Sequence, residues 1–180
     1  DVDWIFAPGG SAEALLKARE QGLVRYIGFT GHKDPNIHRR MLSYGFPFDA
    51  VQMPLNVLDA HYRSFEHEIL PICQGQGIAV IGMKSFASGD IFDATNITPQ
   101  EALRYSMSLP VATLVSGMDS LEIMRQNLAV AQDFQPLTDA ERADILERSR
   151  PHATGKYERF KTTYDFEGNV GRAAHDYPVR

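Results

Sequence analysis

The chain has 180 residues, of which 43% are hydrophobic and 23% are charged, and its formal net charge is -5. This length supports one domain with a substantial core but is short for two. The negative charge argues against a protein whose main task is to bind nucleic-acid backbones, because such binding depends on clustered Lys and Arg. No apolar run approaches the ~20 residues that span a bilayer, so no membrane partner is expected. The single cysteine, Cys73, excludes an internal disulfide and an all-cysteine iron–sulfur site.

The first residues of the chain give two further expectations. The sequence opens at Asp1 without an initiating Met and reaches a loop at residues 7–10 almost at once, as in a chain that begins in the middle of a larger architecture. The opening also lacks the charged-then-apolar pattern of a signal peptide. We therefore expect a cytoplasmic protein that is a piece of a longer one.

Helices and strands are predicted to alternate along most of the chain. A helical apolar pattern closed by glycine predicts a helix over residues 11–21, and a β-branched and aromatic run predicts a strand over 24–30. The next predicted elements are helix 36–43, strand 50–55, helix 65–74, strand 78–83, helix 98–108, strand 111–115, helix 120–132 and helix 138–148. Pro54 is expected to confine the second strand's ladder to its earlier residues, and Pro71 to interrupt or bend its helix.

The spacing of these elements predicts an α/β fold. Strands begin near Val24, Ala50, Ile78 and Val111, and separations on the order of 30 residues are those of βαβ units. Almost continuously apolar strands that alternate with helices indicate a parallel sheet. A complete (β/α)₈ TIM barrel needs roughly 250 residues, so four βα units and a C-terminal helix form either an open sheet or part of a barrel. We assign this unit to residues 1–150.

Residues 151–180 form the second predicted region. They are polar, contain several tyrosines and basic residues among glycines, and show no clear apolar period. We expect an irregular C-terminal tail that either folds over the mouth of the barrel or stays disordered.

Polar residues follow the predicted strands at the edge where parallel α/β proteins bind ligands. Gln52 lies among apolar neighbours, and its amide can donate and accept hydrogen bonds at once, so it either binds a carboxamide ligand or satisfies nearby backbone. The position of Gly117 just before a helix predicts a phosphate-binding site, although glycine is common at such positions. Lys84 either pairs with a phosphate or is simply solvated.

Four segments resemble the aldo-keto reductases in the order that this family has them. The residues that carry the likeness are 22–32 (GLVRYIGFTGH), 48–52 (FDAVQ) with Asn56, 69–71 with 77–83 (GIAVIGM), and 115–117 with Asn127. In order, these segments are similar to the fifth strand, the sixth strand, the seventh strand with the helix before it, and the final cofactor-binding segment of that family. The likeness covers about residues 11–138.

The resemblance implies a (β/α)₈ barrel that transfers a hydride between NADP(H) and a carbonyl or alcohol substrate, of which this chain supplies about strands 5–8. It implies that Thr30 and Gln52 hold the nicotinamide carboxamide, that the loop from Met83 to Gly89 covers the pyrophosphate, and that Asn127 recognises adenine. The cofactor-binding residues expected from it are Thr30, Gln52, Met83, Lys84, Ser85, Gly89, Gly117, Met118, Asp119, Ser120 and Asn127.

Some positions depart from the family pattern. Gly31 stands where the family has an Asn beside Thr30, and Met83 replaces the aromatic residue that stacks on nicotinamide. The Lys and Arg that grip the 2′-phosphate in many members fall at Gly117 and Ile123. The cofactor is therefore expected to be NADP or NAD, with NADP favoured only by the family.

The family's catalytic Asp, Tyr, Lys and His belong to the first four strands, and the resemblance places them ahead of this chain. No tyrosine of the chain has the required setting at a strand end beside a lysine, and no histidine pair has metal-ligand spacing on a helix. We expect no catalytic residue and no metal here, so the chain alone should not turn over substrate.

A rival interpretation is a non-catalytic binding module that closes its half barrel by dimerisation. An open half barrel exposes two sheet edges and an apolar face, which favours self-association under either interpretation.

Overall fold

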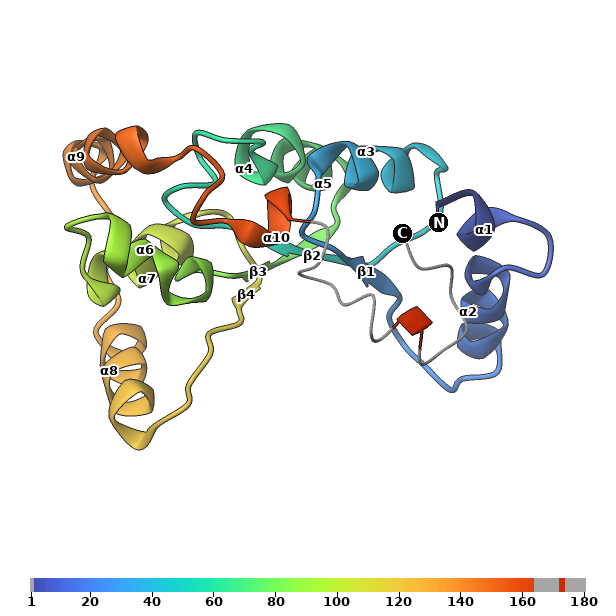
Figure 1. Ribbon diagram of the computed structural model, residues 1–180. Coiled ribbons are helices and arrows are strands. Elements are labelled where there is room, and N and C mark those ends of the chain that lie inside the picture. Colours follow the sequence, from blue (N-terminus) through green and yellow to red (C-terminus); the bar gives the residue numbers. More distant parts are fainter. Residues whose placement is uncertain (1, 164–171, 174–180) are drawn as a thin grey trace.

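A computed structural model describes residues 2–163 and 172–173 (Figure 1). The elements, in chain order, are α1 (Val2–Phe6), α2 (Ser11–Glu20), β1 (Gly28–Thr30), α3 (Pro35–Ser43), β2 (Ala50–Pro54), α4 (Phe65–Glu68), α5 (Leu70–Gln76), β3 (Ala79–Met83), η1 (Ala87–Gly89), α6 (Asp90–Ala94), α7 (Pro99–Ser108), β4 (Thr113–Leu114), α8 (Leu121–Gln132), α9 (Asp139–Ser149), η2 (Arg150–His152) and α10 (Arg159–Thr162). Much of the predicted tail, at 164–171 and 174–180, lies outside the described residues.

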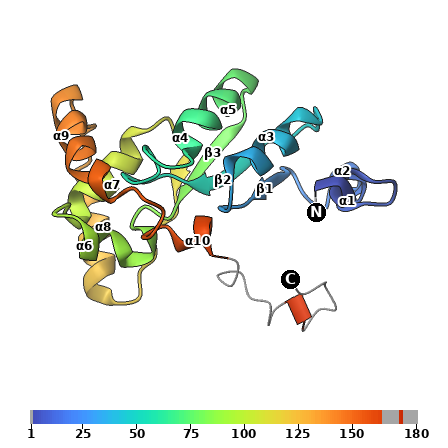
Figure 2. The same cartoon turned by 45° about the horizontal axis from the view of Figure 1, so that its top comes forward.

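The four strands form one parallel sheet in the order β1-β2-β3-β4, which confirms the predicted α/β fold. Across the sheet Thr30 pairs with Gln52, Gln52 with Ile81, and Ile81 with Thr113. Each crossover between neighbouring strands contains at least one helix, as parallel pairing requires. Figure 2 shows α1 and α2 beyond β1 at one end of the sheet and α6, α7, α8 and α9 at the other.

The prediction for Pro54 is wrong, whereas the one for Pro71 is confirmed. β2 pairs with β3 through Pro54, which lies opposite Met83, and the next amide, that of Leu55, donates to the Met83 carbonyl at 3.0 Å. Alternate residues of a parallel strand turn their backbone groups to opposite neighbours, so the missing N–H of Pro54 faces the side where β1 has already ended. Pro71 lies in the first turn of α5, just after the chain breaks from α4.

Helices α7 and α9 each begin with a capping box, a motif that residues 98–101 (TPQE) and 138–141 (TDAE) carry in the sequence. Thr98 and Thr138 each accept a hydrogen bond from the backbone of a glutamate three residues on, whose side chain bonds back to the threonine amide. Sequence reasoning missed α1 and the short helices η1 and α6 within the predicted loop after β3.

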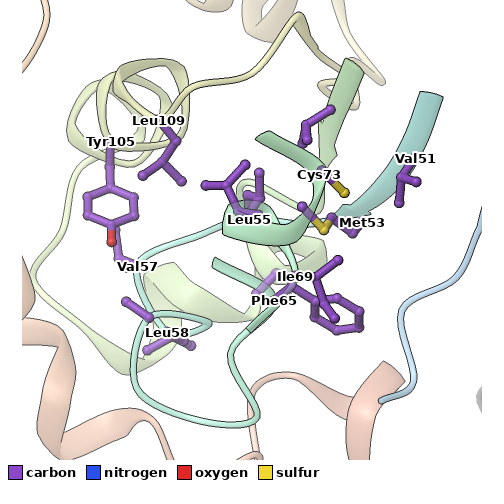
Figure 3. Close-up of a cluster of buried hydrophobic side chains, with 14 of the residues drawn as sticks. Val51, Met53, Leu55, Val57, Leu58, Phe65, Ile69, Cys73, Tyr105 and Leu109 are labelled. Carbon is purple, nitrogen blue, oxygen red and sulfur yellow. The ribbon is translucent and has the colours of Figure 1, made fainter. Parts of the chain in front are cut away.

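The core lies on the helix-covered face of the two central strands. Val51 and Met53 of β2 and Val80 of β3 point to this face and are almost fully buried. Apolar residues of the β2–α4 connection and of α4, α5 and α7 belong to the same cluster (Figure 3). On the opposite face Thr30 and Thr113 are exposed and Gln52 is half-buried. The sheet therefore has one fully packed face and one open face.

Candidate functional site

A cavity of about 740 Å³ opens at the carboxyl ends of β2, β3 and β4. Its lining combines the end of β2, the loop after β3, the first helices that follow it, and the connection from β4 into α8. The lining residues are Gln52, Met83, Lys84, Ser85, Phe86, Ser88, Gly89, Phe92, Pro99, Val115, Gly117, Met118, Asp119, Ile123 and Gln126. The site is mainly apolar with a few polar groups, which is typical of small-molecule and cofactor sites.

Most of the residues predicted from the sequence meet in this cavity. Those that line it are Gln52, Met83, Lys84, Ser85, Gly89, Gly117, Met118 and Asp119. They come from three separate segments, and the parallel sheet places these segments together because all its strands end at the same edge.

Three predicted residues lie outside the cavity lining. Thr30 is exposed at the end of β1, next to Gln52 in the register of the sheet. Ser120 caps α8, since its Oγ accepts from the Ile123 amide at 3.2 Å. Asn127 is buried, donates to the Ser116 Oγ at 3.0 Å and borders a second cavity of about 570 Å³ between α7, β4 and α8.

The Gln52 side chain has the polar groups that a carboxamide ligand needs. Its backbone carbonyl accepts from the Gly31 amide, but its side-chain amide makes no hydrogen bond within the described residues. The side chain of Gln52 therefore does not satisfy nearby backbone in the described structure, and its binding to a carboxamide stays a prediction.

Gly31 departs from the family pattern for a steric reason. A Cβ at residue 31 would lie 2.9 Å from Cε1 of the buried His38 ring, closer than ordinary contacts allow. Burial also lowers the pKa of His38 to about 4, so this ring is neutral at physiological pH. The neutral ring occupies the space that a larger side chain at residue 31 would need.

The loop that follows β3 has an unusual backbone. Lys84, Ala87 and Ser88 have φ values of 57°, 47° and 65°, in the left-handed region that non-glycine residues rarely adopt. Two short hydrogen bonds close the loop, from the Ala87 amide to the Lys84 carbonyl at 2.8 Å and from the Gly89 amide to the Phe86 carbonyl at 2.7 Å. Strained backbone of this kind concentrates at ligand-binding and functional segments.

The charges of the lining are few. Lys84 and Asp119 are its only ionisable residues among those that the structure describes. The Lys84 Nζ lies 3.4 Å from the Ser88 Oγ and 5.6 Å from the centre of the Phe160 ring. One lysine is enough to pair with a pyrophosphate, whereas Asp119 would repel a further phosphate placed near it.

The described lining of the cavity contains neither tyrosine nor histidine. Tyr105, the most deeply buried tyrosine of the described residues, donates to the Glu66 Oε2 at 2.7 Å, and burial raises its pKa above the ordinary value. It therefore has the opposite of the lowered pKa that a proton donor needs. Within residues 2–163 and 172–173, no three potential ligands gather to hold a metal ion.

No helix in the described part of the chain has both the length and the apolar character to cross a bilayer.

Sequence reasoning missed a buried charged cluster directly behind the cavity. Asp59, Glu158 and Lys161 are at most 1% exposed and lie together with Asn56, which donates to the Lys84 carbonyl at 3.2 Å. The available signal was Asp59, an acidic residue in the stretch 53–60, where Asn56 is the only other polar residue. Its partners lie about a hundred residues further on, where no local pattern identifies them.

The family model of the aldo/keto reductase family matches residues 10–102, which is more than half of the chain. The chain belongs to the aldo/keto reductase family. No protein of curated function matches the sequence.

Solved aldo-keto reductases share the fold. The holo form of aldo-keto reductase AKR11C1 from Bacillus halodurans has a TM-score of 0.66 at 20% identity, over 83% of this chain and 59% of that one. For glycerol dehydrogenase AKR11B4 from Gluconobacter oxydans the TM-score is 0.56 at 18% identity, over 78% and 54%. For an aldose reductase from Schistosoma japonicum it is 0.52 at 12% identity, over 86% and 53%. The chain thus spans between half and three-fifths of the length of these proteins.

Proposed function

We propose that this chain provides the cofactor-binding half of an aldo-keto reductase, corresponding to strands 5–8 of the barrel. The parent reaction is hydride transfer between NADP or NAD and a small carbonyl or alcohol substrate. The observation that carries the proposal is the cavity at the ends of β2, β3 and β4, where three distant segments bring together most of the residues that the family resemblance implies.

Each part of the cavity has groups suited to one part of a nicotinamide dinucleotide, whose nicotinamide ring would supply or accept the hydride. The Gln52 amide, with Thr30 beside it in the sheet, can donate to and accept from a carboxamide. The Lys84 ammonium and the left-handed loop at residues 84–89 suit a pyrophosphate. The segment from Gly117 to Ser120 leads into the amino end of α8, which favours negative charge.

The adenine end and the choice of cofactor are less constrained. Asn127 would reach adenine only if its bond to Ser116 opened, because that bond holds its amide on the side of the second cavity. Gly117 and Ile123 line the first cavity where many family members carry cations. We therefore expect a weaker preference for NADP over NAD than the family resemblance implies.

No tyrosine is among the described residues that line the cavity, and the family resemblance places the proton donor on strands that precede this chain. The chain alone is then a binding unit without turnover. The rival proposal is a non-catalytic half barrel that closes by dimerisation. It is supported by the exposed apolar side chains of α8, of which Leu121 is 65% and Leu128 50% exposed.

Calorimetric titration of the chain with NADP⁺ and NAD⁺ tests the proposal. We expect micromolar binding of at least one nucleotide, and about tenfold weaker binding by Gln52→Leu, which loses two hydrogen bonds to the carboxamide. Lys17→Met is the matched control, because Lys17 lies on the exposed face of α2 and pairs only with Glu13. If a folded, monodisperse sample binds neither nucleotide, the cofactor assignment is wrong. An upstream reading frame with four more βα units would favour the enzyme over the rival.

A further inference from the structure

The segment of residues 155–163, here called the C-terminal strap, is anchored in the molecule. Glu158, Phe160 and Lys161 are at most 1% exposed, although they lie in a short polar stretch near the end of the described chain. Gly155 opens the strap with a φ of 84°, and a Cβ there would lie 2.7 Å from both Tyr62 and Thr162. The strap ends with α10, which lies near β2 in both views (Figures 1 and 2).

Its anchor is the buried charged cluster. The Lys161 Nζ lies 2.6 Å from the Asp59 Oδ1 and 3.0 Å from the Glu158 Oε1, and donates to the Tyr62 carbonyl at 2.8 Å. The Asp59 carboxylate also accepts from two amides at the start of α4. One ammonium thus serves two carboxylates, and each charge has hydrogen bonds in addition to its opposite charge, which buried ions require.

Asn56 joins this cluster to the candidate cofactor site. Its Oδ1 accepts from the amides of Leu58 and Asp59 at 2.8 and 2.9 Å. Its Nδ2 donates to the Glu158 Oε1 at 3.1 Å and to the Lys84 carbonyl at 3.2 Å. Because all four hydrogen-bonding positions of a fully buried amide are occupied, its orientation is fixed.

The strap contacts the Lys84 side chain as well. The Lys84 Nζ lies over the Phe160 ring, 5.6 Å from its centre, within the range of a cation–π interaction. Lys84 is therefore held at two points, its carbonyl through Asn56 and Glu158 and its ammonium through Phe160. Lys84 is also the first left-handed residue of the loop, so its conformation directs the residues that follow.

We propose that the C-terminal strap sets the conformation of the loop at residues 84–89, with Asn56, Glu158 and Phe160 as positioning residues for nucleotide binding. The left-handed conformations of Lys84, Ala87 and Ser88 cost free energy and persist only where the surroundings impose them. The strap, 70 residues further along the chain, supplies these surroundings. The link to nucleotide rests on the proposed function; the link to loop conformation does not.

Two measurements on the full chain test this inference. The first is hydrogen exchange at the Ala87 and Gly89 amides, whose hydrogen bonds close the loop. The second is the Kd of NADP⁺ and NAD⁺ by calorimetry. The variants are Asn56→Asp, which keeps both accepted bonds but lacks the NH2 group that donates to Glu158 and to the Lys84 carbonyl, and Phe160→Leu, which removes the ring but keeps apolar bulk. Phe160→Leu carries the test by itself if Asn56→Asp fails to fold.

Tyr105→Phe is the matched control. Tyr105 belongs to a second partly buried cluster, in which its hydroxyl donates to Glu66 and Arg142 lies beside its ring. We expect both strap variants to exchange the two loop amides at least about tenfold faster than wild type and to bind nucleotide about tenfold more weakly. The control should change neither quantity.

The outcomes separate the two proposals. If the wild-type chain binds neither nucleotide, the proposed function fails, and the exchange rates alone decide whether the strap holds the loop. If folded strap variants exchange and bind as the control does, the strap is only a structural anchor and the inference is overturned. If exchange accelerates but the Kd of a binding wild-type chain is unchanged, the positioning role in nucleotide binding is overturned.

Discussion

The centre of the sheet and its β4 edge differ in how completely their apolar residues are buried. Along β2 and the connection after it, Met53, Leu55 and Val57 are fully buried. At the edge, β4 has only two residues, and Asn127 is the sole buried residue of the twelve in α8. Leu121, Met124 and Leu128 of that helix are 65%, 39% and 50% exposed.

The difference shows that an apolar stripe does not by itself define a core. The stripe of α8 has the helical period that normally faces an interior, yet here it contributes little buried area, and buried apolar area is the main source of stability. The candidate site is lined by residues of both regions. Gln52 and the loop at residues 84–89 come from the centre of the sheet, and Gly117 to Asp119 come from its β4 edge. A bound nucleotide would therefore tie the weakly packed edge to the well-packed centre.

The largest expected effect is at the anchor of the central region. Lys161→Met leaves the Asp59 and Glu158 carboxylates buried without their shared cation, and we expect the free energy of unfolding to fall by about 3–5 kcal/mol. Urea denaturation measures this loss. Lys17→Met is the control, since its ion pair is exposed and should have no resolvable effect. Equal stability of the two variants would show that the buried cluster is not an anchor.

A pair of truncations tests the comparison directly. Met53→Ala removes a fully buried side chain of β2 and should lower the free energy of unfolding by about 2–5 kcal/mol. Leu128→Ala removes a half-exposed side chain of α8 and should change it by no more than about 0.5 kcal/mol. Denaturation of both variants at one low protein concentration makes the comparison. A loss of 2 kcal/mol or more at Leu128, on the scale of a core truncation, would mean that the edge is as well packed as the centre.

The free energy of unfolding should depend on pH through two buried groups, Glu158 and His38. Burial raises the pKa of Glu158 from 4.5 to about 7, so the folded chain binds a proton that the unfolded chain has lost between these pH values. The Glu158 contribution is thus fully present below pH 4.5 and is lost as pH rises toward 7. Burial acts oppositely on His38, whose pKa falls from 6.5 to about 4, so its contribution is lost as pH falls through this range.

Glu158→Gln separates these two contributions. The unfolding free energy of wild type relative to this variant should decrease between pH 4.5 and 7, by on the order of 3 kcal/mol. Between pH 4 and 6.5 the variant should lose less stability than wild type, because His38 still acts and Glu158 no longer does; Asp59, whose pKa burial also raises, opposes His38 in both proteins. Urea midpoints at several pH values provide both curves. A difference that does not vary with pH would show that Glu158 does not titrate in this range.

How far the sequence determines the structure depends on the range of each interaction. The capping boxes at Thr98 and Thr138 act within four residues, and the sequence predicts them fully. The gathering of Gln52, Lys84 and Gly117 follows from strand order alone, because parallel strands end at one edge. The bond of Lys161 to Asp59 joins residues 102 positions apart, and no local period or motif indicates it.

The positions of Asn127 and Thr30 show a second limit of sequence reasoning. A motif gives the residue and the element, but the hydrogen bond to Ser116 decides which way Asn127 faces. Thr30 has the predicted place at the end of β1, yet it lies outside the lining of the cavity. Side-chain direction and cavity walls depend on packing between elements, which the local sequence does not contain.

The smallest expected effect on stability is at the edge. Leu121→Asp replaces a 65% exposed side chain in the first turn of α8, where a negative charge suits the helix dipole. The free energy of unfolding at low protein concentration should therefore change by no more than about 0.5 kcal/mol. Self-association should weaken, because exposed apolar patches of this kind drive association. Sedimentation velocity over a concentration series measures the second effect, with Glu122→Gln as the control on the same turn. If both variants associate as wild type does, the α8 face is not the associating surface and the open face of the sheet becomes the next to test.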